Sequence, residues 1–194
     1  MKKIIMLAAC FAALQLNAQT ISSGVNMDSL FKAKEQESAG MLFPQFVAMA
    51  GKQEICNTTL EGKIVFVNFW FEACPPCIAE MDALNALYKK FHADTCFEFI
   101  SFTHEQAANI PMLKRRHRMA YKVASVSNNE CYRLNQNNGF PTSIIIGKDG
   151  RIIRLFTGGT TNRKEAAAFI RHEIYPILST ALHTTDSSGH KKRP

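Results

Sequence analysis

The most constraining part of this sequence is an apolar run that leads directly to two cysteines. The run is Ile64-Val65-Phe66-Val67-Asn68-Phe69-Trp70, and the cysteines follow as Cys74-Pro75-Pro76-Cys77. A short apolar run of this kind predicts a buried β-strand. After it, apolar residues recur at the spacing of one helix face, at Ile78, Met81, Leu84, Leu87, Tyr88 and Phe91. The cysteine pair therefore lies where a strand ends and a helix begins.

This position favours reactive thiol chemistry over a structural role. Free N–H groups and the helix dipole at a helix start favour a negative charge, so a thiolate forms more readily there. A disulfide that closes so short a loop adds little stability, but it suits rapid exchange between neighbouring sulfurs. A zinc site would need about four ligands, whereas Cys56, Cys96 and Cys131 are scattered singly. We predict no metal and no cofactor.

The first residues predict export. Lys2 and Lys3 precede an apolar stretch that is too short to span a membrane, and residues 1–18 fit a signal peptide cleaved after Ala18. The alternative is a lipid anchor at Cys10, because Leu7-Ala8-Ala9-Cys10 resembles a lipoprotein box. The predicted location is periplasmic or extracytoplasmic, where disulfides persist. Membrane association is expected only if Cys10 carries lipid.

Charge and cysteine count limit the class of partner. Cleavage would remove Lys2, Lys3 and Cys10, which lowers the formal net charge from +7 to +5 and the cysteine count from six to five. An odd count leaves at least one thiol unpaired or paired between molecules. A basic surface on an exported protein indicates acidic partners or membrane surfaces, and not nucleic acid.

The rest of the chain divides into an N-terminal extension (19–39) with a short helix after Asp28, a folded domain (40–182) and a basic flexible tail (183–194). Within the domain, an extended segment is expected over 43–47. Strands are predicted at 64–70, 97–102, 121–126, 143–146 and 152–156. Helices are predicted after the cysteines and at 110–119, 129–135 and 163–182, the last broken or kinked at Pro176. This order, βαβ and then ββα, predicts an α/β fold with one mixed central sheet flanked by helices.

The chain resembles the thioredoxin-like superfamily, and within it the exported bacterial TlpA/ResA-like thiol-disulfide oxidoreductases. The resemblance covers about residues 40–182. Four stretches carry it: Phe43-Pro44-Gln45-Phe46, Glu61-Gly62-Lys63 leading to Asn68-Phe69-Trp70, Cys74-Pro75-Pro76-Cys77 with Glu80-Met81, and Gly139-Phe140-Pro141-Thr142.

The resemblance implies a cis bond between Phe140 and Pro141, packed against the cysteine pair, and a substrate strand that binds the backbone before Pro141. Two departures stand out. Ala73 occupies a position where many relatives have Trp, which opens the site. Asn68 stands where thioredoxin has a buried Asp, so proton transfer by an acid at that position is not available.

The candidate site residues have distinct expected roles. Cys74 comes first and is expected to be the more exposed sulfur and the attacking thiolate, with Cys77 as the resolving thiol. Glu80 is either a solvated helix residue or, as the resemblance supports, an acid that tunes Cys74 or relays a proton. A substrate-binding wall is predicted from Trp70, Pro75, Pro76, Phe140 and Pro141.

Several polar or reactive residues have simpler expected roles. Glu72 is predicted to be a surface residue, and His104 a loop residue. Cys56, Cys96 and Cys131 are either buried small apolar residues or include a second disulfide. The charge run Lys114-Arg115-Arg116-His117-Arg118 is either a solvated helix face or a docking site for an acidic partner.

The leading hypothesis is an enzyme that exchanges disulfides with partner proteins, as a reductant recharged by a membrane electron donor, for example in cytochrome c maturation. An oxidase that introduces disulfides, with a membrane acceptor, is the alternative, because the sequence does not decide the direction of electron flow. A peroxidase is disfavoured, since the Pro-x-x-x-Thr-x-x-Cys segment of peroxiredoxins is absent. A copper carrier would use the thiolates, but copper-delivering relatives usually have three residues between the cysteines.

Overall fold

The structure is a computed structural model that describes residues 27–184. The predicted signal peptide, the alternative anchor at Cys10 and tail residues 185–194 lie outside the described residues. The chain divides into two units, residues 1–33 and 34–194. Helix α2 (Met27–Ser38) confirms the helix predicted after Asp28 and is longer than expected. All further description concerns the second unit.

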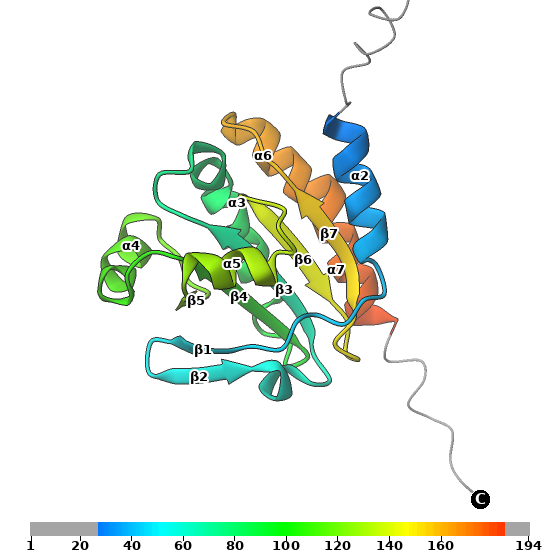
Figure 1. The fold of residues 1–194 in the computed structure, drawn as a ribbon, viewed down its shortest axis with the longest axis horizontal. Coiled ribbons are helices and arrows are strands. Elements are labelled where there is room, and N and C mark those ends of the chain that lie inside the picture. Colours follow the sequence, from blue (N-terminus) through cyan, green and yellow to red (C-terminus); the bar gives the residue numbers. More distant parts are fainter. Residues whose placement is uncertain (1–26, 185–194) are drawn as a thin grey trace, which may run out of the picture. The chain divides into compact units, whose positions relative to one another are not determined.

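The second unit is built on a seven-stranded mixed sheet (Figure 1), in the spatial order β2-β1-β5-β4-β3-β6-β7. Strand β3 pairs in parallel with β4 and antiparallel with β6. Strands β4 and β5 are parallel, whereas β6 and β7 form an antiparallel hairpin. The predicted βαβ-then-ββα fold is therefore confirmed. The strands are β1 (Val47–Ala50), β2 (Gln53–Cys56), β3 (Ile64–Trp70), β4 (Phe97–Thr103), β5 (Lys122–Ser125), β6 (Thr142–Ile146) and β7 (Ile152–Thr157).

Helices cover both faces of the sheet. The α-helices are α3 (Pro75–Phe91), α4 (Ile110–Arg116), α5 (Asn128–Leu134), α6 (Arg163–Phe169) and α7 (Tyr175–His183). Short 3₁₀ turns span Asn57–Leu60 and Ala107–Asn109. The apolar face of α3 packs with α7 against Phe66 and Trp70, whereas Leu134 of α5 packs on the opposite face, against Val67 and Phe69. All seven residues of β3 are buried, because each side of the strand faces one of these two cores.

The structure adds one hairpin to the sequence-based prediction and shows how the last helix is broken. The β1–β2 hairpin was not predicted, since an extended segment was expected only over 43–47. Its strands are four residues each and rich in Ala, Met, Gln and Glu, which favour strands weakly. The helix predicted over 163–182 is interrupted by a π-helical turn, Ile170–Ile174, just before Pro176. The break expected at this proline is thereby confirmed, since proline cannot donate the helical hydrogen bond.

Asn85 ties the loop after α4 to helix α3. Its side chain is buried, and its Nδ2 donates to the carbonyls of Met81 (2.9 Å) and His117 (3.0 Å). Its Oδ1 accepts from the backbone N–H of Ala120 at 3.2 Å. One side chain therefore satisfies two backbone groups of the loop 117–120, which would otherwise lack partners near the protein interior.

Replacing Asn85 by Ala should destabilise the protein by about 1–3 kcal/mol, because a partly buried carbonyl and a partly buried N–H would lose their partner and a buried side chain would be truncated. The midpoint of urea unfolding measures this loss. Asn129→Ala on the exposed side of α5 is the matched control and should change stability by less than about 0.5 kcal/mol. Equal effects of the two substitutions would contradict the anchoring role of Asn85.

Candidate active site

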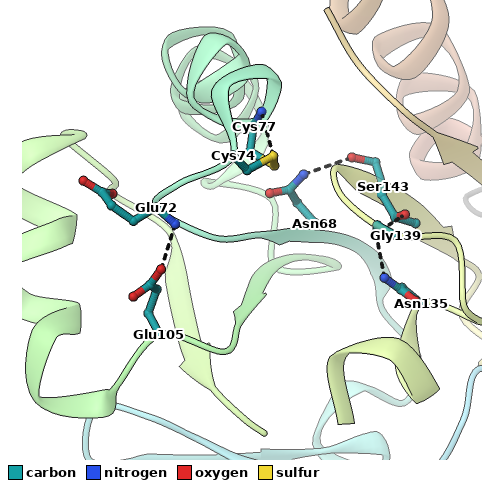
Figure 2. The surroundings of a disulfide bond; sticks show 9 residues. Asn68, Glu72, Cys74, Cys77, Glu105, Asn135, Gly139 and Ser143 are labelled. Carbon is teal, nitrogen blue, oxygen red and sulfur yellow. Dashed lines mark hydrogen bonds between the residues drawn. A yellow bond between two sulfur atoms is a disulfide. The ribbon is translucent and has the colours of Figure 1, made fainter. Parts of the chain in front are cut away.

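Cys74 and Cys77 form a disulfide at the start of α3, with their Cα atoms 5.3 Å apart. Figure 2 shows the pair at the N-terminal end of α3, beside the carboxyl end of β3. Both residues are buried in this oxidised form, with Cys74 4% exposed and Cys77 1%. Cys74 is the more exposed of the two, as expected, but only by a small margin. A thiol that attacks this disulfide must therefore reach the small exposed part of Cys74.

The two prolines change the electrostatics of the helix start. Cys74 is the N-cap of α3, and its Sγ accepts a hydrogen bond from the Cys77 N–H at 3.3 Å. Pro75 and Pro76 occupy the first helical positions, which proline tolerates because N–H groups there have no helical partner. They also remove two of the donors that a helix start normally offers to an anion. The site therefore stabilises a Cys74 thiolate less than a helix start with free N–H groups would.

Asn68 and Trp70 lie under the pair on the face of β3 that meets α3. Asn68 is 1% exposed, and its Nδ2 donates to Ser143 Oγ at 3.2 Å, as Figure 2 shows. Its Oδ1 has no hydrogen-bond partner among the described residues. Trp70 is fully buried and belongs to the same core cluster as the two cysteines. Its expected place in the core is confirmed, whereas its substrate-binding role stays a prediction.

Glu80 is a buried acid one turn after Cys77. It is only 4% exposed, so the alternative of a solvated helix residue is wrong. Burial raises its pKa to about 8, because charging a carboxyl away from water is costly. Burial, and to a smaller extent the charge of Glu80, also raises the pKa of Tyr121. A protonated carboxyl that titrates near neutral pH can give or take a proton during thiol exchange.

The Phe140–Pro141 bond is cis, as the resemblance implies. The loop after β7 packs closely on this proline and on Glu80. A Cβ on Gly159 would lie 2.8 Å from Pro141 Cγ and 2.9 Å from Glu80 Oε1, closer than real Cβ contacts allow. Gly159 therefore lets three separate segments, α3, the Pro141 turn and the β7–α6 loop, meet at one point. No motif in the sequence marked this glycine.

Aromatic rings gather next to Pro141. The ring of Phe140 contacts those of Phe71 and His104 at centroid distances of 5.3 and 5.6 Å, and that of Tyr132 at 5.5 Å. His104 directly follows β4, where a loop residue was expected, and its Nδ1 has no partner among the described residues. These rings form one side of the surface around the predicted substrate-binding residues.

Two acids hold the segment before Cys74. The backbone N–H of Glu72 donates to Glu105 Oε1 at 2.8 Å, drawn in Figure 2. The Glu72 carboxylate accepts from Arg116 and from His117 Nε2, the latter at 2.8 Å. Burial acts to raise the pKa of Glu72, but the hydrogen bonds and charges of Arg116 and His117 outweigh it and hold this pKa below its ordinary value. Glu72 is thus more than a surface residue.

The other three described cysteines are not part of the redox pair. Cys131 is buried and burial raises its pKa to about 12, whereas Cys56 and Cys96 are partly exposed, contrary to expectation. All three are free thiols. The described residues contain no cluster of His, Cys, Asp or Glu that could hold a metal ion.

Ala73 is exposed and lines a hollow of 370 Å³ together with residues that include Pro75 and Ala79. A larger residue at position 73 would fill part of this hollow.

Comparisons with known proteins agree with this geometry. Residues 39–155 match the AhpC/TSA family. ResA, a thiol-disulfide oxidoreductase of Bacillus cereus, is 30% identical over 137 residues, covering 69% of this chain and 78% of ResA. ResA of Bacillus subtilis is 24% identical over 135 residues, covering 69% of this chain and 75% of its own length.

The solved structures show the same fold. A thiol:disulfide interchange protein of the thioredoxin family from Chlorobium tepidum has a TM-score of 0.58 at 22% identity, covering 74% of this chain and 97% of that protein. The chain therefore belongs to the thioredoxin-like AhpC/TSA family, and it is a thiol-disulfide oxidoreductase related to ResA.

Proposed function

We propose that this protein is exported and reduces disulfides in partner proteins, with Cys74 as the attacking thiol and Cys77 as the resolving thiol. The observation that carries the proposal is the Cys74–Cys77 disulfide at the start of α3, one helical turn before the buried acid Glu80. The predicted signal peptide supports export. Among residues 27–184, no helix is long and apolar enough to cross a bilayer.

The proposed reaction is a two-electron exchange in two steps. The Cys74 thiolate attacks one sulfur of the substrate disulfide, forms a mixed disulfide and expels the other substrate sulfur as a thiolate. The Cys77 thiolate then attacks Cys74 Sγ and releases the first substrate sulfur. The substrate gains two electrons and leaves as a dithiol, while the enzyme becomes the oxidised form seen here. Glu80 lies one helical turn after Cys77, and its pKa near 8 supports a role in exchanging a proton with the sulfurs.

The surroundings of the sulfurs favour the reducing direction. A strong oxidant such as DsbA owes its high potential to a stabilised reduced thiolate. Here Pro75 and Pro76 supply neither N–H donors nor charge, and both cysteines lie in an apolar core cluster. A carboxylate formed at Glu80 would disfavour a neighbouring thiolate further. With little stabilisation of the thiolate, the dithiol gives up its electrons readily.

A reductant in an oxidising compartment must be recharged. We infer a membrane electron donor for this step, and substrates whose cysteines must be reduced before assembly. Apocytochrome c is one substrate of this kind, and the family resemblance supports it.

Replacing Cys77 by Ser should trap substrate proteins as mixed disulfides through Cys74, because the resolving thiol is gone. Non-reducing electrophoresis followed by peptide mapping of the adducts checks this result. The matched control is the Cys74→Ser, Cys77→Ser double variant.

The control matters because Cys56 is another candidate nucleophile. It is partly exposed, and hydrogen bonds from Thr58 and Thr59 lower its pKa. Adducts that persist in the double variant, or that map to Cys56, would contradict the role of Cys74.

Replacing Glu80 by Gln should flatten the pH dependence of stability. Because the folded pKa of Glu80 is raised from 4.5 to about 8, its stability contribution is full below about pH 4.5 and is lost as the pH rises to about 8. The loss should amount to a few kcal/mol (~1.4 kcal/mol per unit) in the wild type and be absent in Glu80→Gln. Urea unfolding of the oxidised protein across this range measures it.

The same variant tests whether Glu80 acts on the reaction. We expect the pH profile of Cys74 alkylation to move to lower pH in Glu80→Gln, because a neutral amide does not oppose the thiolate. Glu61→Gln, at an exposed position, is the control and should leave the profile in place. If both variants keep the wild-type profile, Glu80 has no part in the chemistry.

A further inference from the structure

The basic run at the C-terminal end of α4, residues 114–118, contains three residues with side-chain partners and two, Arg115 and Arg118, without a partner among the described residues. Lys114 Nζ donates to the carbonyl of Tyr121 at 2.7 Å, and Arg116 and His117 bind Glu72. Cations in the last turn of α4 are also stabilised by its dipole. The Arg118 guanidinium lies beyond the helix and forms no hydrogen bond or ion pair with any residue in the described range. Arg115 and Arg118 are both exposed, as the solvated-face interpretation expects, but Arg118 differs from Arg115 in its backbone and in lining a hollow.

The backbone at Arg118 favours a different residue. Its φ is 54°, in the left-handed region, at the position after a helix end where glycine is usual. The turn is closed by hydrogen bonds from the Arg118 N–H to the Arg115 carbonyl and from the Met119 N–H to the Lys114 carbonyl. Asn85 holds the residues on both sides, His117 and Ala120. An arginine is thus held in a strained turn where glycine would fit better, which favours a role for its side chain.

This side chain lines a hollow of 220 Å³ with a positive charge surplus. Ile78 and Met81 of α3 supply apolar lining, and the basic residues are Arg116, His117, Arg118 and Arg163. Two acids pair with these arginines. Asp82, which also lines the hollow, binds Arg163 at 2.9 Å, and Glu72 binds Arg116. Three arginines thus face two carboxylates. The Arg163–Asp82 pair is well exposed on both sides, so water screens it and an incoming acid can compete for Arg163.

The basic hollow adjoins the reactive pair. Ile78 and Arg163 also line the 370 Å³ hollow that is bounded by Ala73 and Pro75. The Ile78 N–H donates to the Cys74 carbonyl at 3.0 Å, so this lining begins one helical turn from the attacking sulfur. A polypeptide whose disulfide meets Cys74 therefore has a continuous path over Ala73 and Ile78 to the arginines.

We propose that the hollow lined by Arg118 and Arg163 recognises acidic side chains of the substrate protein, in the segment that flanks the cysteine attacked by Cys74. This inference rests on the proposed disulfide-exchange function and names the substrate class for it. The occupant is an extended acidic segment of a protein, because the hollow is continuous with the surface on which the substrate disulfide must lie. Charge complementarity of this kind raises the rate of encounter more than it raises final affinity.

The test uses the reduced full chain and three synthetic peptides, each with one Cys-x-x-Cys disulfide. The flanking residues are Asp and Glu in the first peptide, Asn and Gln in the second, and Lys in the third. Stopped-flow Trp70 fluorescence follows the rate of exchange. At low salt, we expect the acidic peptide to react at least about fivefold faster than the neutral one. The ratio should fall toward unity at about 0.5 M salt, where exposed charges are screened.

Two substitutions at one position make the test specific. Arg118→Gly should lower the acidic-to-neutral rate ratio at least about twofold. It should not lower the urea midpoint, because glycine adopts the left-handed turn without strain. Arg118→Asp should move the preference toward the Lys-flanked peptide. Arg115→Gln is the matched control, since Arg115 lies on the same helix end, is exposed and does not line the hollow.

Three outcomes would overturn the inference. The first is a wild-type ratio near unity at low salt. The second is an equal fall in Arg115→Gln and Arg118→Gly, which would assign the effect to net charge alone. The third is that none of the peptides is reduced, which would refute the proposed exchange function and this inference with it. Reduction of the neutral peptide without any preference for acid refutes only the inference.

Discussion

The complete burial of β3 is the constraint on which the rest of the structure depends. Its seven residues face two separate cores, so the strand must lie inside the sheet with helices on both sides. The chain leaves this strand at its carboxyl end and turns into α3. Cys74 and Cys77 lie at that turn. The reactive pair is thus rigidly placed by packing, although the energy for that packing comes from apolar residues that take no part in the chemistry.

The segments packed around the carboxyl end of β3 determine the chemistry of the cysteine pair. Gly159 allows the loop after β7 to reach Pro141 and Glu80, and this contact keeps the acid away from water. The two prolines after Cys74 withdraw N–H donors that would otherwise stabilise a thiolate. A poorly solvated sulfur favours the protonated dithiol, and so does a carboxylate formed at Glu80. On the proposed function, the same few residues that hold the site together also weaken the stabilisation of the thiolate, as expected of a reductant.

The sequence allowed the central strands, the helix after the cysteines and the pair itself to be predicted, because each depends on local periodicity or on a compact motif. The β1–β2 hairpin was missed because its short strands carry little apolar alternation. The burial of Glu80, the contact of Gly159 and the anchoring of Glu72 by Glu105 and His117 depend on residues far apart in the chain. Such contacts leave no local signal in the sequence. The left-handed backbone of Arg118 likewise could not be predicted, because it depends on the turn around it.

The reduction potential of the Cys74–Cys77 pair tests the central claim most directly, namely that weak stabilisation of the thiolate makes the protein a reductant. Trp70 is the only tryptophan in the chain and belongs to the core cluster of the pair, so its fluorescence can follow the redox state against a dithiothreitol or glutathione series. The account predicts a potential at or below that of thioredoxin, about −270 mV. A value close to that of DsbA, about −120 mV, would contradict it and identify an oxidase.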